Sequence, residues 1–220
     1  MVKQKETGNL IIISGPSGAG KDTIVNELLK KNKNIVLSVS KTTRAPRKGE
    51  EEGKDYYYVT KEEFLKEVDK GNFLEFARVY NDDYYGTPKD MVLKNIANGK
   101  DVILVIDIQG AIKVKEIMPE SIFIFIMPPS MKELKERLIK RDTESSTKLL
   151  DRFKTAYKEI NEATKYNYVV INDKVERAVK KVESIIIAEK CRVDRIEDFD
   201  LNSEQELIHE LLVEKGLTNA

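Results

Sequence analysis

The sequence has few of the residues that mark disulfide-rich or membrane-spanning proteins. It contains one cysteine, one histidine and no tryptophan among 220 residues. The single cysteine, Cys191, excludes an internal disulfide and is typical of a reducing compartment. The longest apolar runs, at residues 102–106 and 122–127, are too short to span a bilayer. Residues 1–9 are polar and contain no signal-like apolar stretch, so we predict a cytoplasmic protein with no membrane partner.

Neither sign of charge is in excess. Lysine plus arginine and aspartate plus glutamate both number 38, so the formal net charge at pH 7 is zero. A chain without a bulk positive field does not gather nucleic acid or anionic lipid electrostatically. We therefore predict no nucleic-acid partner, and any anion site must be built locally.

The apolar residues occur in short continuous runs separated by helical patterns. Such runs indicate strands that are buried on both faces, and hence a parallel sheet with helices on each side. The runs lie at residues 10–13, 35–39, 102–106, 122–127 and 168–171. A chain of 220 residues is long enough for one substantial core with insertions. The predicted fold class is therefore α/β.

Two stretches interrupt this alternation. Residues 40–87 contain the arginine pair Arg44 and Arg47, several tyrosines and a helix start at the capping box Thr60 to Glu63. They indicate a strand-rich lobe inserted at the carboxyl edge of the sheet, where α/β proteins bind ligands. Residues 141–150 are polar and lie between helical segments, which is typical of a lid.

The remaining segments complete the predicted organisation. We expect the core at residues 8–39 and 88–191, within one domain that spans residues 1–191. Residues 192–220 form a charged extension, with a helix that a Ser203 to Glu206 capping box begins.

A glycine-rich loop follows the first apolar run and precedes a helical pattern. Its glycines let consecutive N–H groups turn toward phosphate oxygens, and the helix adds the positive end of its dipole. Lys21 supplies a mobile cation for the terminal phosphates. The sequence therefore predicts a phosphate-binding loop for a nucleotide. Its candidate residues are Gly15, Pro16, Ser17, Gly18, Ala19, Gly20, Lys21, Asp22 and Thr23.

The residue after the loop lysine departs from the usual pattern. Phosphate-binding loops normally place a serine or threonine there, and its hydroxyl binds Mg²⁺. This chain has Asp22 instead. The carboxylate could ligate Mg²⁺ directly or through water, or its charge could weaken ATP binding when the metal is absent. Of these, we hypothesise coordination through water.

Two arginines mark a second candidate phosphate site. Arg44 and Arg47 flank Pro46, and Tyr56 follows downstream. Guanidinium groups bind phosphate bidentately, and a tyrosine hydroxyl adds a neutral donor. The alternative is a solvated basic turn whose arginines pair with the glutamates at 50–52.

Four further ordered motifs accompany the stretch from Ser38 to Tyr56 and the arginines of the lid. These motifs are Leu74-Glu75, Tyr84 to Thr87, Ile106 to Gly110 and Val170 to Asp173. In these residues, from about residue 10 to about residue 191, the chain resembles guanylate kinases of the nucleoside monophosphate kinase type. The resemblance implies a P-loop fold with an inserted GMP-binding lobe and a short helical lid. It also implies transfer of a phosphoryl group from ATP to GMP or dGMP, with Mg²⁺ as the cofactor.

The same resemblance implies how the lobe binds GMP. The phosphate ligands would be Arg44, Arg47, Tyr56 and Tyr85, and the residues around the base would be Ser40, Glu75, Thr87 and Asp107. The chemistry of Glu75 agrees, because guanine presents N1–H and an N2 amino group side by side to a carboxylate. Adenine lacks that donor pair, and a site built to bind such an edge can reject the analogue by roughly 10⁴.

Three arginines form the third cluster. Arg137 and Arg141 lie four residues apart on one helical face, and Arg152 is expected to begin the helix after the lid. The resemblance implies that they act with Lys21 on the ATP phosphates, and that Asn172 lies near the adenine and ribose. Cations that arrive on closure stabilise the transition state selectively. The alternative is exposed helix charges that balance neighbouring carboxylates.

Two other readings stay open at this point. The chain could be a catalytically weak guanylate-kinase-like binding module, although such modules tend to lose the loop lysine and the lid arginines. It could also be a kinase for another nucleoside monophosphate, which Glu75 and Ser40 argue against. The sequence does not choose between a monomer and a homodimer.

Overall fold

The structure is a computed structural model that describes residues 3–4, 7–47, 49–78, 82–141, 146–198 and 201–214. The chain divides into two compact units. One is Thr7–Glu183, and the other joins Met1–Glu6 to Ser184–Ala220. Everything that concerns the candidate site belongs to the first unit.

The first unit is built on a five-stranded parallel sheet. Its strands lie in the order β10-β9-β2-β8-β3. Their bounds are β2 Leu10–Ser14, β3 Ile35–Leu37, β8 Asp101–Val105, β9 Ile122–Met127 and β10 Tyr168–Ile171. Strands β2 and β9 are buried over almost their whole length, as continuous apolar runs require. The prediction of an α/β fold with a parallel sheet is confirmed. Strands β9 and β10 coincide with the predicted runs, and the ends of β2, β3 and β8 differ by one or two residues.

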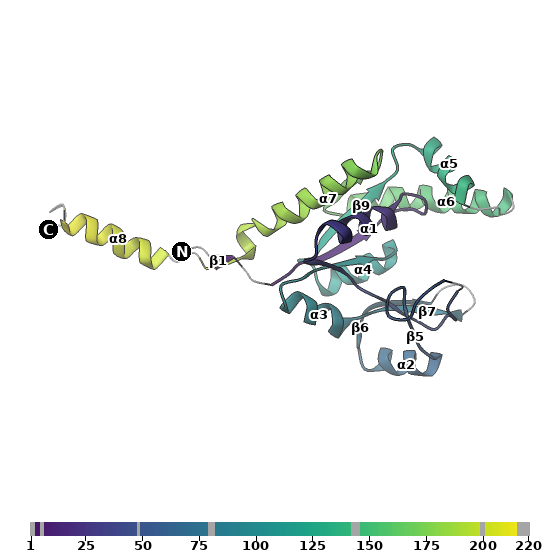
Figure 1. The fold of residues 1–220 in the computed structure, drawn as a ribbon, viewed down its shortest axis with the longest axis horizontal. Helices are drawn as coiled ribbons and strands as arrows, with labels where there is room; N and C mark the ends of the chain where they lie inside the picture. Colours follow the sequence, from purple (N-terminus) through teal and green to yellow (C-terminus); the bar gives the residue numbers. More distant parts are fainter. Residues whose placement is uncertain are drawn as a thin grey trace. The chain divides into compact units, whose positions relative to one another are not determined.

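Helices lie between the strands of this sheet along the chain, and one more, α7, follows its last strand. They are α1 Lys21–Lys31, α3 Lys89–Ala97, α4 Ile108–Ile117, α5 Met131–Arg141, α6 Ser146–Asn161 and α7 Val175–Lys190, with a 3₁₀ turn η2 at Glu162–Lys165. Figure 1 shows α3 and α4 on the side of the sheet that faces a smaller strand-rich layer. The core contains side chains such as Ile12, Val114 and Phe123, none more than 1% exposed.

The smaller layer is a four-stranded sheet in the order β5-β4-β7-β6. Its elements are β4 Lys41–Thr42, β5 Tyr57–Tyr58, α2 Lys61–Asp69, β6 Phe73–Arg78 and β7 Tyr84–Pro88. The predicted capping box begins α2: Thr60 Oγ1 accepts from the Glu63 N–H, and the Glu63 carboxylate accepts from the Thr60 N–H. Phe64 stacks on Phe73 at a centroid distance of 4.5 Å. Residues 41–88 therefore bury an apolar cluster of their own on one face of this sheet.

The second unit contains β1 Lys3–Gln4, η3 Val193–Arg195, β11 Ile196–Asp198 and α8 Leu201–Glu214. Strands β1 and β11 pair in antiparallel. The prediction that Ser203 begins the last helix is wrong, because α8 begins at Leu201 and contains Ser203 in its first turn. Among the described residues, no helix is both long and apolar enough to cross a bilayer. The predicted boundary at residue 191 stays a prediction.

Candidate active site

The glycine-rich loop connects the carboxyl end of β2 to the first turn of α1. Its backbone adopts positive φ at Gly15 (147°) and at Gly20 (90°). A Cβ on Gly15 would lie 2.2 Å from the Ile126 carbonyl oxygen, and one on Gly20 would lie 2.4 Å from Asn172 Nδ2. These two positions therefore require glycine both for their backbone conformation and for the close approach of β9 and of Asn172, the residue after β10.

The Gly20→Ala substitution should destabilise the protein and disturb the loop together. We expect a loss of about 2 kcal/mol or more in the free energy of unfolding, because the left-handed conformation is strained and Asn172 must move. Urea unfolding measures this loss, and an ADP titration measures the effect on the loop. Gly71→Ala is the matched control, since Gly71 also has positive φ (69°) but has open space around it. A Gly20→Ala protein that is as stable as Gly71→Ala would contradict this account of the loop.

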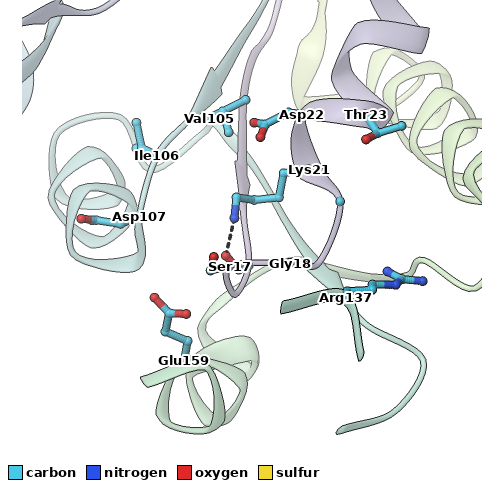
Figure 2. A pocket seen from close by; sticks show the side chains of 12 residues that line it. Ser17, Gly18, Lys21, Asp22, Thr23, Val105, Ile106, Asp107, Arg137 and Glu159 are labelled. Atoms are coloured by element: carbon cyan, nitrogen blue, oxygen red, sulfur yellow. Dashed lines mark hydrogen bonds between the residues drawn. The ribbon is translucent and has the colours of Figure 1, made fainter. Parts of the chain in front are cut away.

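Lys21 lies against the inner side of the loop. Its Nζ donates to the carbonyl oxygens of Gly15 at 2.6 Å and Pro16 at 3.3 Å. A cavity of about 610 Å³ opens beside it. The lining residues are Gly15, Ser17, Gly18, Gly20, Lys21, Asp22, Thr23, Val105, Ile106, Asp107, Arg137 and Glu159. Figure 2 shows Lys21 and Glu159 directed at the loop from different elements.

Arg137 and Asn172 support the other side of the loop. Asn172 is 3% exposed, and its Nδ2 donates to the Ala19 carbonyl at 2.8 Å. Arg137 donates to the Asn172 carbonyl at 2.9 Å and to the Glu133 carboxylate one turn earlier on α5. The structure thus places Asn172 on the loop backbone. Its predicted proximity to adenine and ribose stays a prediction.

Helix α6 contacts the tip of the loop. Arg152 Nη2 donates to Ser17 Oγ at 2.8 Å. Arg152 was expected to begin this helix, but α6 starts at Ser146, so Arg152 lies well inside it. Arg141 is the last residue of α5, and its side chain lies outside the described part of the structure. Of the expected lid at 141–150, residues 142–145 also lie outside the described residues.

Arg44 and Tyr85 come together on the smaller sheet. Arg44 Nε donates to the Tyr85 hydroxyl at 2.8 Å, and its guanidinium lies 5.5 Å from the Tyr56 ring centre. The Tyr56 and Tyr85 rings meet edge to face at 5.6 Å. Burial raises the pKa of Tyr56, so its hydroxyl stays a neutral donor. Three of the four predicted phosphate ligands are therefore adjacent.

Glu50 occupies the centre of the arginine turn. Both of its carboxylate oxygens accept from Arg44 Nη2, at 2.9 and 3.0 Å. One oxygen also accepts from the Arg47 N–H and the Tyr58 hydroxyl, both at 2.8 Å. The hydrogen bond from Arg44 is the main reason that the pKa of Glu50 falls to about 2. The arginine turn is thus ordered by an internal carboxylate, while the Arg47 side chain is exposed.

Glu75 and Thr87 face each other across β6 and β7. Thr87 Oγ1 donates to Glu75 Oε1 at 2.6 Å, and Glu75 is 8% exposed. Burial, assisted by the negative charge of Asp107, raises the pKa of Glu75. A Cβ on Gly110 would lie 3.1 Å from Glu75 Oε2, so this glycine leaves room for the carboxylate. Asp107 itself caps α4, because its Oδ1 accepts from the Gly110 N–H at 2.8 Å.

The chain is similar to known proteins over most of its length. The family model described as guanylate kinase matches residues 7–189. The chain belongs to the guanylate kinase family. It is 60% identical to the guanylate kinase of Clostridium tetani over 207 residues, which are 94% of this chain and 99% of the relative. It is 58% identical to the guanylate kinase of Caldanaerobacter subterraneus subsp. tengcongensis over 204 residues, which are 93% of this chain and 98% of that one.

A solved structure supports the fold of this guanylate kinase family member. The crystal structure of guanylate kinase from Anaplasma phagocytophilum matches with a TM-score of 0.72 and 38% identity. The match covers 95% of each chain. The family assignment therefore rests on sequence and on fold together.

Sequence reasoning missed three polar residues in this guanylate kinase family member. Glu50 was considered only as a solvated partner of the arginines, and Tyr58 and Glu159 were not considered. The available signals for Glu50 were its spacing, three residues after Arg47, and its place within the stretch from Ser38 to Tyr56. Ser40 contributes its carbonyl oxygen, which accepts from the Tyr57 N–H at 2.9 Å and joins β4 to β5.

Proposed function

We propose that this chain transfers the γ-phosphoryl group of ATP to GMP, with the glycine-rich loop as the donor site and the smaller sheet as the acceptor site. One observation supports the acceptor assignment most strongly. Tyr85 and Thr87 are two residues apart on β7, so they face the same side of the strand, opposite Ala77 and Glu75 on β6. A phosphate ligand and a base ligand are thereby separated by roughly 7 Å. That arrangement suits a nucleotide lying along the sheet.

We assign the roles in the acceptor site from these contacts. Arg44, Arg47, Tyr56 and Tyr85 bind the GMP phosphate, and Ser40, Glu75, Thr87 and Asp107 surround the guanine. Arg44 reaches Tyr85 and Glu50 together, so its guanidinium is held in place before a phosphate binds. The Glu75 carboxylate accepts the guanine N1–H and N2 amino group, and Thr87 fixes its orientation.

The donor site provides positive charge and backbone donors. The loop N–H groups hold the ATP phosphates, and Lys21 approaches the transferring group. Arg137, Arg141 and Arg152 neutralise the charge that develops during transfer. The GMP phosphate is already ionised, so the acceptor needs no general base, and catalysis consists of alignment and electrostatic stabilisation.

We also propose a Mg²⁺ site beside the loop. The Asp22 carboxylate and the Thr23 hydroxyl line the cavity, and oxygen donors of this kind suit Mg²⁺ that is shared with phosphates. When bound, the ion neutralises charge on the phosphate oxygens that surround the breaking bond. Asp22 is the residue that would hold it, by way of water.

Asp22→Ser tests this metal assignment. We expect the Mg²⁺ concentration that gives half-maximal activity to change by about threefold or more, because a charged outer ligand is replaced by a neutral one. A Mg²⁺ titration of initial rates at fixed ATP and GMP measures it. Asp69→Asn, which removes an exposed carboxylate at the end of α2, is the control. An unchanged Mg²⁺ dependence in Asp22→Ser would remove Asp22 from the metal site.

Tyr58→Phe tests the internal support of the arginine turn. Without its hydroxyl, Glu50 loses one of its donors, and Arg44 is held less firmly. We expect the KM for GMP to rise about fivefold, because a hydrogen bond to a charged group is lost. The affinity for guanosine, which has no phosphate, should stay the same. An equal loss of guanosine affinity would show that Tyr58 acts on the whole lobe rather than on the phosphate ligands.

The proposed reaction has a direct test. Incubation of the full chain with ATP, Mg²⁺ and GMP should form ADP and GDP in equal amounts. Nucleotide chromatography measures both products. Binding of GMP without formation of GDP at saturating ATP would favour the binding-module reading and overturn the proposal.

A further inference from the structure

The carbonyl of Ala19, in the glycine-rich loop, is held by two side chains from other elements. Asn172 Nδ2 donates to it at 2.8 Å, and Arg137 Nη1 donates to it at 3.5 Å. Arg137 lies on α5, and Asn172 follows the last residue of β10. Arg137 also donates to the Asn172 carbonyl at 2.9 Å, which ties the two residues together. The roles assigned above do not use Asn172.

The peptide between Ala19 and Gly20 links this carbonyl to an N–H on its opposite side. A trans peptide is planar, and its C=O and N–H bonds point in opposite directions. The described part of the chain contains no cis peptide. Because the Ala19 carbonyl accepts from Asn172, the Gly20 N–H points away from Asn172. The orientation of this N–H is therefore set by the side chain that holds the carbonyl.

The Gly20 N–H is available to a ligand. Gly20 lines the cavity beside Lys21 and immediately precedes the first residue of α1. In the part of the chain that the structure describes, its N–H donates to no backbone carbonyl, whereas the Ala19 N–H donates to the Pro16 carbonyl at 3.1 Å. Backbone N–H groups at the start of a helix, in loops of this kind, bind phosphate oxygens.

The buried amide of Asn172 is not explained by stability alone. Asn172 is 3% exposed, and among the described residues its Oδ1 has no hydrogen-bond partner. A buried acceptor without a partner costs free energy. Reversal of the amide would not help, because Oδ1 would then face the Ala19 carbonyl oxygen, and two acceptors repel each other. Asn172 thus keeps its donor on the loop although its acceptor stays unpaired.

We propose that Asn172 is a positioning residue, which holds the Ala19 carbonyl so that the Gly20 N–H is directed at a phosphate oxygen of the donor nucleotide. This inference rests on the proposed function, because it assumes that the donor binds at the loop. Arg137 supports the same carbonyl from a greater distance and fixes the backbone of Asn172. Asn172 thereby strengthens the binding of phosphate through Gly20.

The sequence provides a probe for this one peptide. Ala19 is the only alanine that a glycine follows. The full chain, labelled with ¹³C at the alanine carbonyls and ¹⁵N in glycine, therefore gives one resonance in a spectrum that correlates each amide with the preceding carbonyl. In Asn172→Leu, which has an apolar side chain of similar shape, the carbonyl carbon should move upfield because a hydrogen bond is lost. On addition of ADP, the Gly20 amide proton should move downfield in the wild type and less in the variant.

Binding constants show whether this orientation matters to the nucleotide. The affinity for ADP, measured by calorimetry, should fall about tenfold in Asn172→Leu, because a hydrogen bond to a charged group is weakened. The affinity for GMP should not change. Asn167→Leu is the matched control, since Asn167 Oδ1 accepts from the Phe123 N–H at 3.0 Å at the other end of β10. It should keep the wild-type loop resonance and the wild-type ADP affinity.

A second variant replaces the leucine variant if that protein does not fold. Asn172→Asp has nearly the shape of asparagine but presents an oxygen to the Ala19 carbonyl. Its carbonyl-carbon resonance should also move upfield in the protein without nucleotide. Thermal unfolding of each variant shows whether the fold is retained.

The outcomes separate this inference from the proposed function. An unmoved Ala19 carbonyl resonance in the folded variants would overturn it, as would an ADP affinity of Asn172→Leu equal to that of the wild type. So would a GMP affinity that falls as much as the ADP affinity. A wild-type Gly20 amide proton that stays in place when ADP binds would overturn it without any variant. Wild-type protein that binds no ADP would instead contradict the donor site itself.

Discussion

Replacement of Lys21 by methionine should lower kcat by about 10³, the largest loss expected from any single donor-site change. Lys21 is the first residue of α1, and its ammonium lies over the Gly15 and Pro16 carbonyls, next to the cavity. In the proposed donor site, it would provide positive charge where the negative charge of the transferring phosphoryl group develops. Methionine keeps much of the length of the side chain but carries no charge. Steady-state rates at saturating ATP and GMP measure the loss.

The pattern of the effect matters as much as its size. The KM for GMP should stay within about twofold of the wild-type value, because the Lys21 ammonium lies against the Gly15 and Pro16 carbonyls of the proposed donor loop. Lys30→Met is the matched control, since Lys30 lies near the other end of the same helix and pairs with the exposed Glu27. Its rates should equal those of the wild type. A Lys21→Met enzyme with full kcat would remove Lys21 from the catalytic machinery.

Replacement of Glu75 by glutamine should lower kcat/KM for GMP by about 10³. In the proposed guanine site, the amide would present an NH₂ group to the N1–H or N2 amino group of guanine. One hydrogen bond would then be replaced by two donors that face each other. Thr87 can still donate to the amide oxygen, which keeps the side chain in place. Selectivity over AMP should decrease together with the activity, and kinetics with both nucleotides measure it.

The same substitution should stabilise the protein without nucleotide. Burial raises the pKa of Glu75 in the folded state. At neutral pH, the ionised carboxylate therefore lowers the free energy of unfolding relative to an uncharged side chain. Stability from this group is present below the unfolded-state pKa and is lost as pH rises through the raised folded-state pKa. Glutamine carries no charge, so the penalty disappears. Thermal unfolding at pH 7 should therefore give a higher midpoint for Glu75→Gln than for wild type.

The pH dependence of GMP binding follows from the same shift. The proposed contact with guanine needs the ionised carboxylate, so wild-type affinity for GMP should fall as pH drops through the pKa of Glu75, which burial raises. Glu75→Gln should lack this component. Glu62→Gln, an exposed carboxylate on α2, is the control for net charge and should keep the wild-type profile. A glutamine variant with wild-type selectivity for GMP would contradict the role assigned to Glu75.

The elements that sequence predicted well are those fixed by local chemistry. Continuous apolar runs located all five strands of the main sheet, because burial on both faces leaves few polar positions. Thr60 and Glu63 gave the start of α2 correctly, since a capping box is a local set of hydrogen bonds. The loop at Gly15 to Thr23 was recognisable because glycines and a lysine in this order, between a strand and a helix, are characteristic of phosphate-binding loops.

The elements that sequence did not give depend on tertiary contacts. Ser203 and Glu206 have the spacing of a capping box, but α8 begins two residues before Ser203. A serine and a glutamate three residues apart can also both lie within a helix, so the spacing alone does not fix where the helix begins. Glu159 is one of several charged residues on α6. The packing of Ala156 against α5 turns the face of α6 that carries Glu159 toward the loop. Glu50 and Tyr58 meet because β5 pairs with β4, a contact that no spacing along the chain specifies.

The ratio of kcat/KM for GMP to kcat/KM for AMP, at saturating ATP and Mg²⁺, tests the central claim most directly. It tests two parts of the proposal together: that ATP bound at the loop donates a phosphoryl group, and that the Glu75 site selects guanine. The account predicts a ratio of at least about 10³, with CMP and UMP as poor as AMP. A ratio near one, or no GDP formed from GMP, would contradict it.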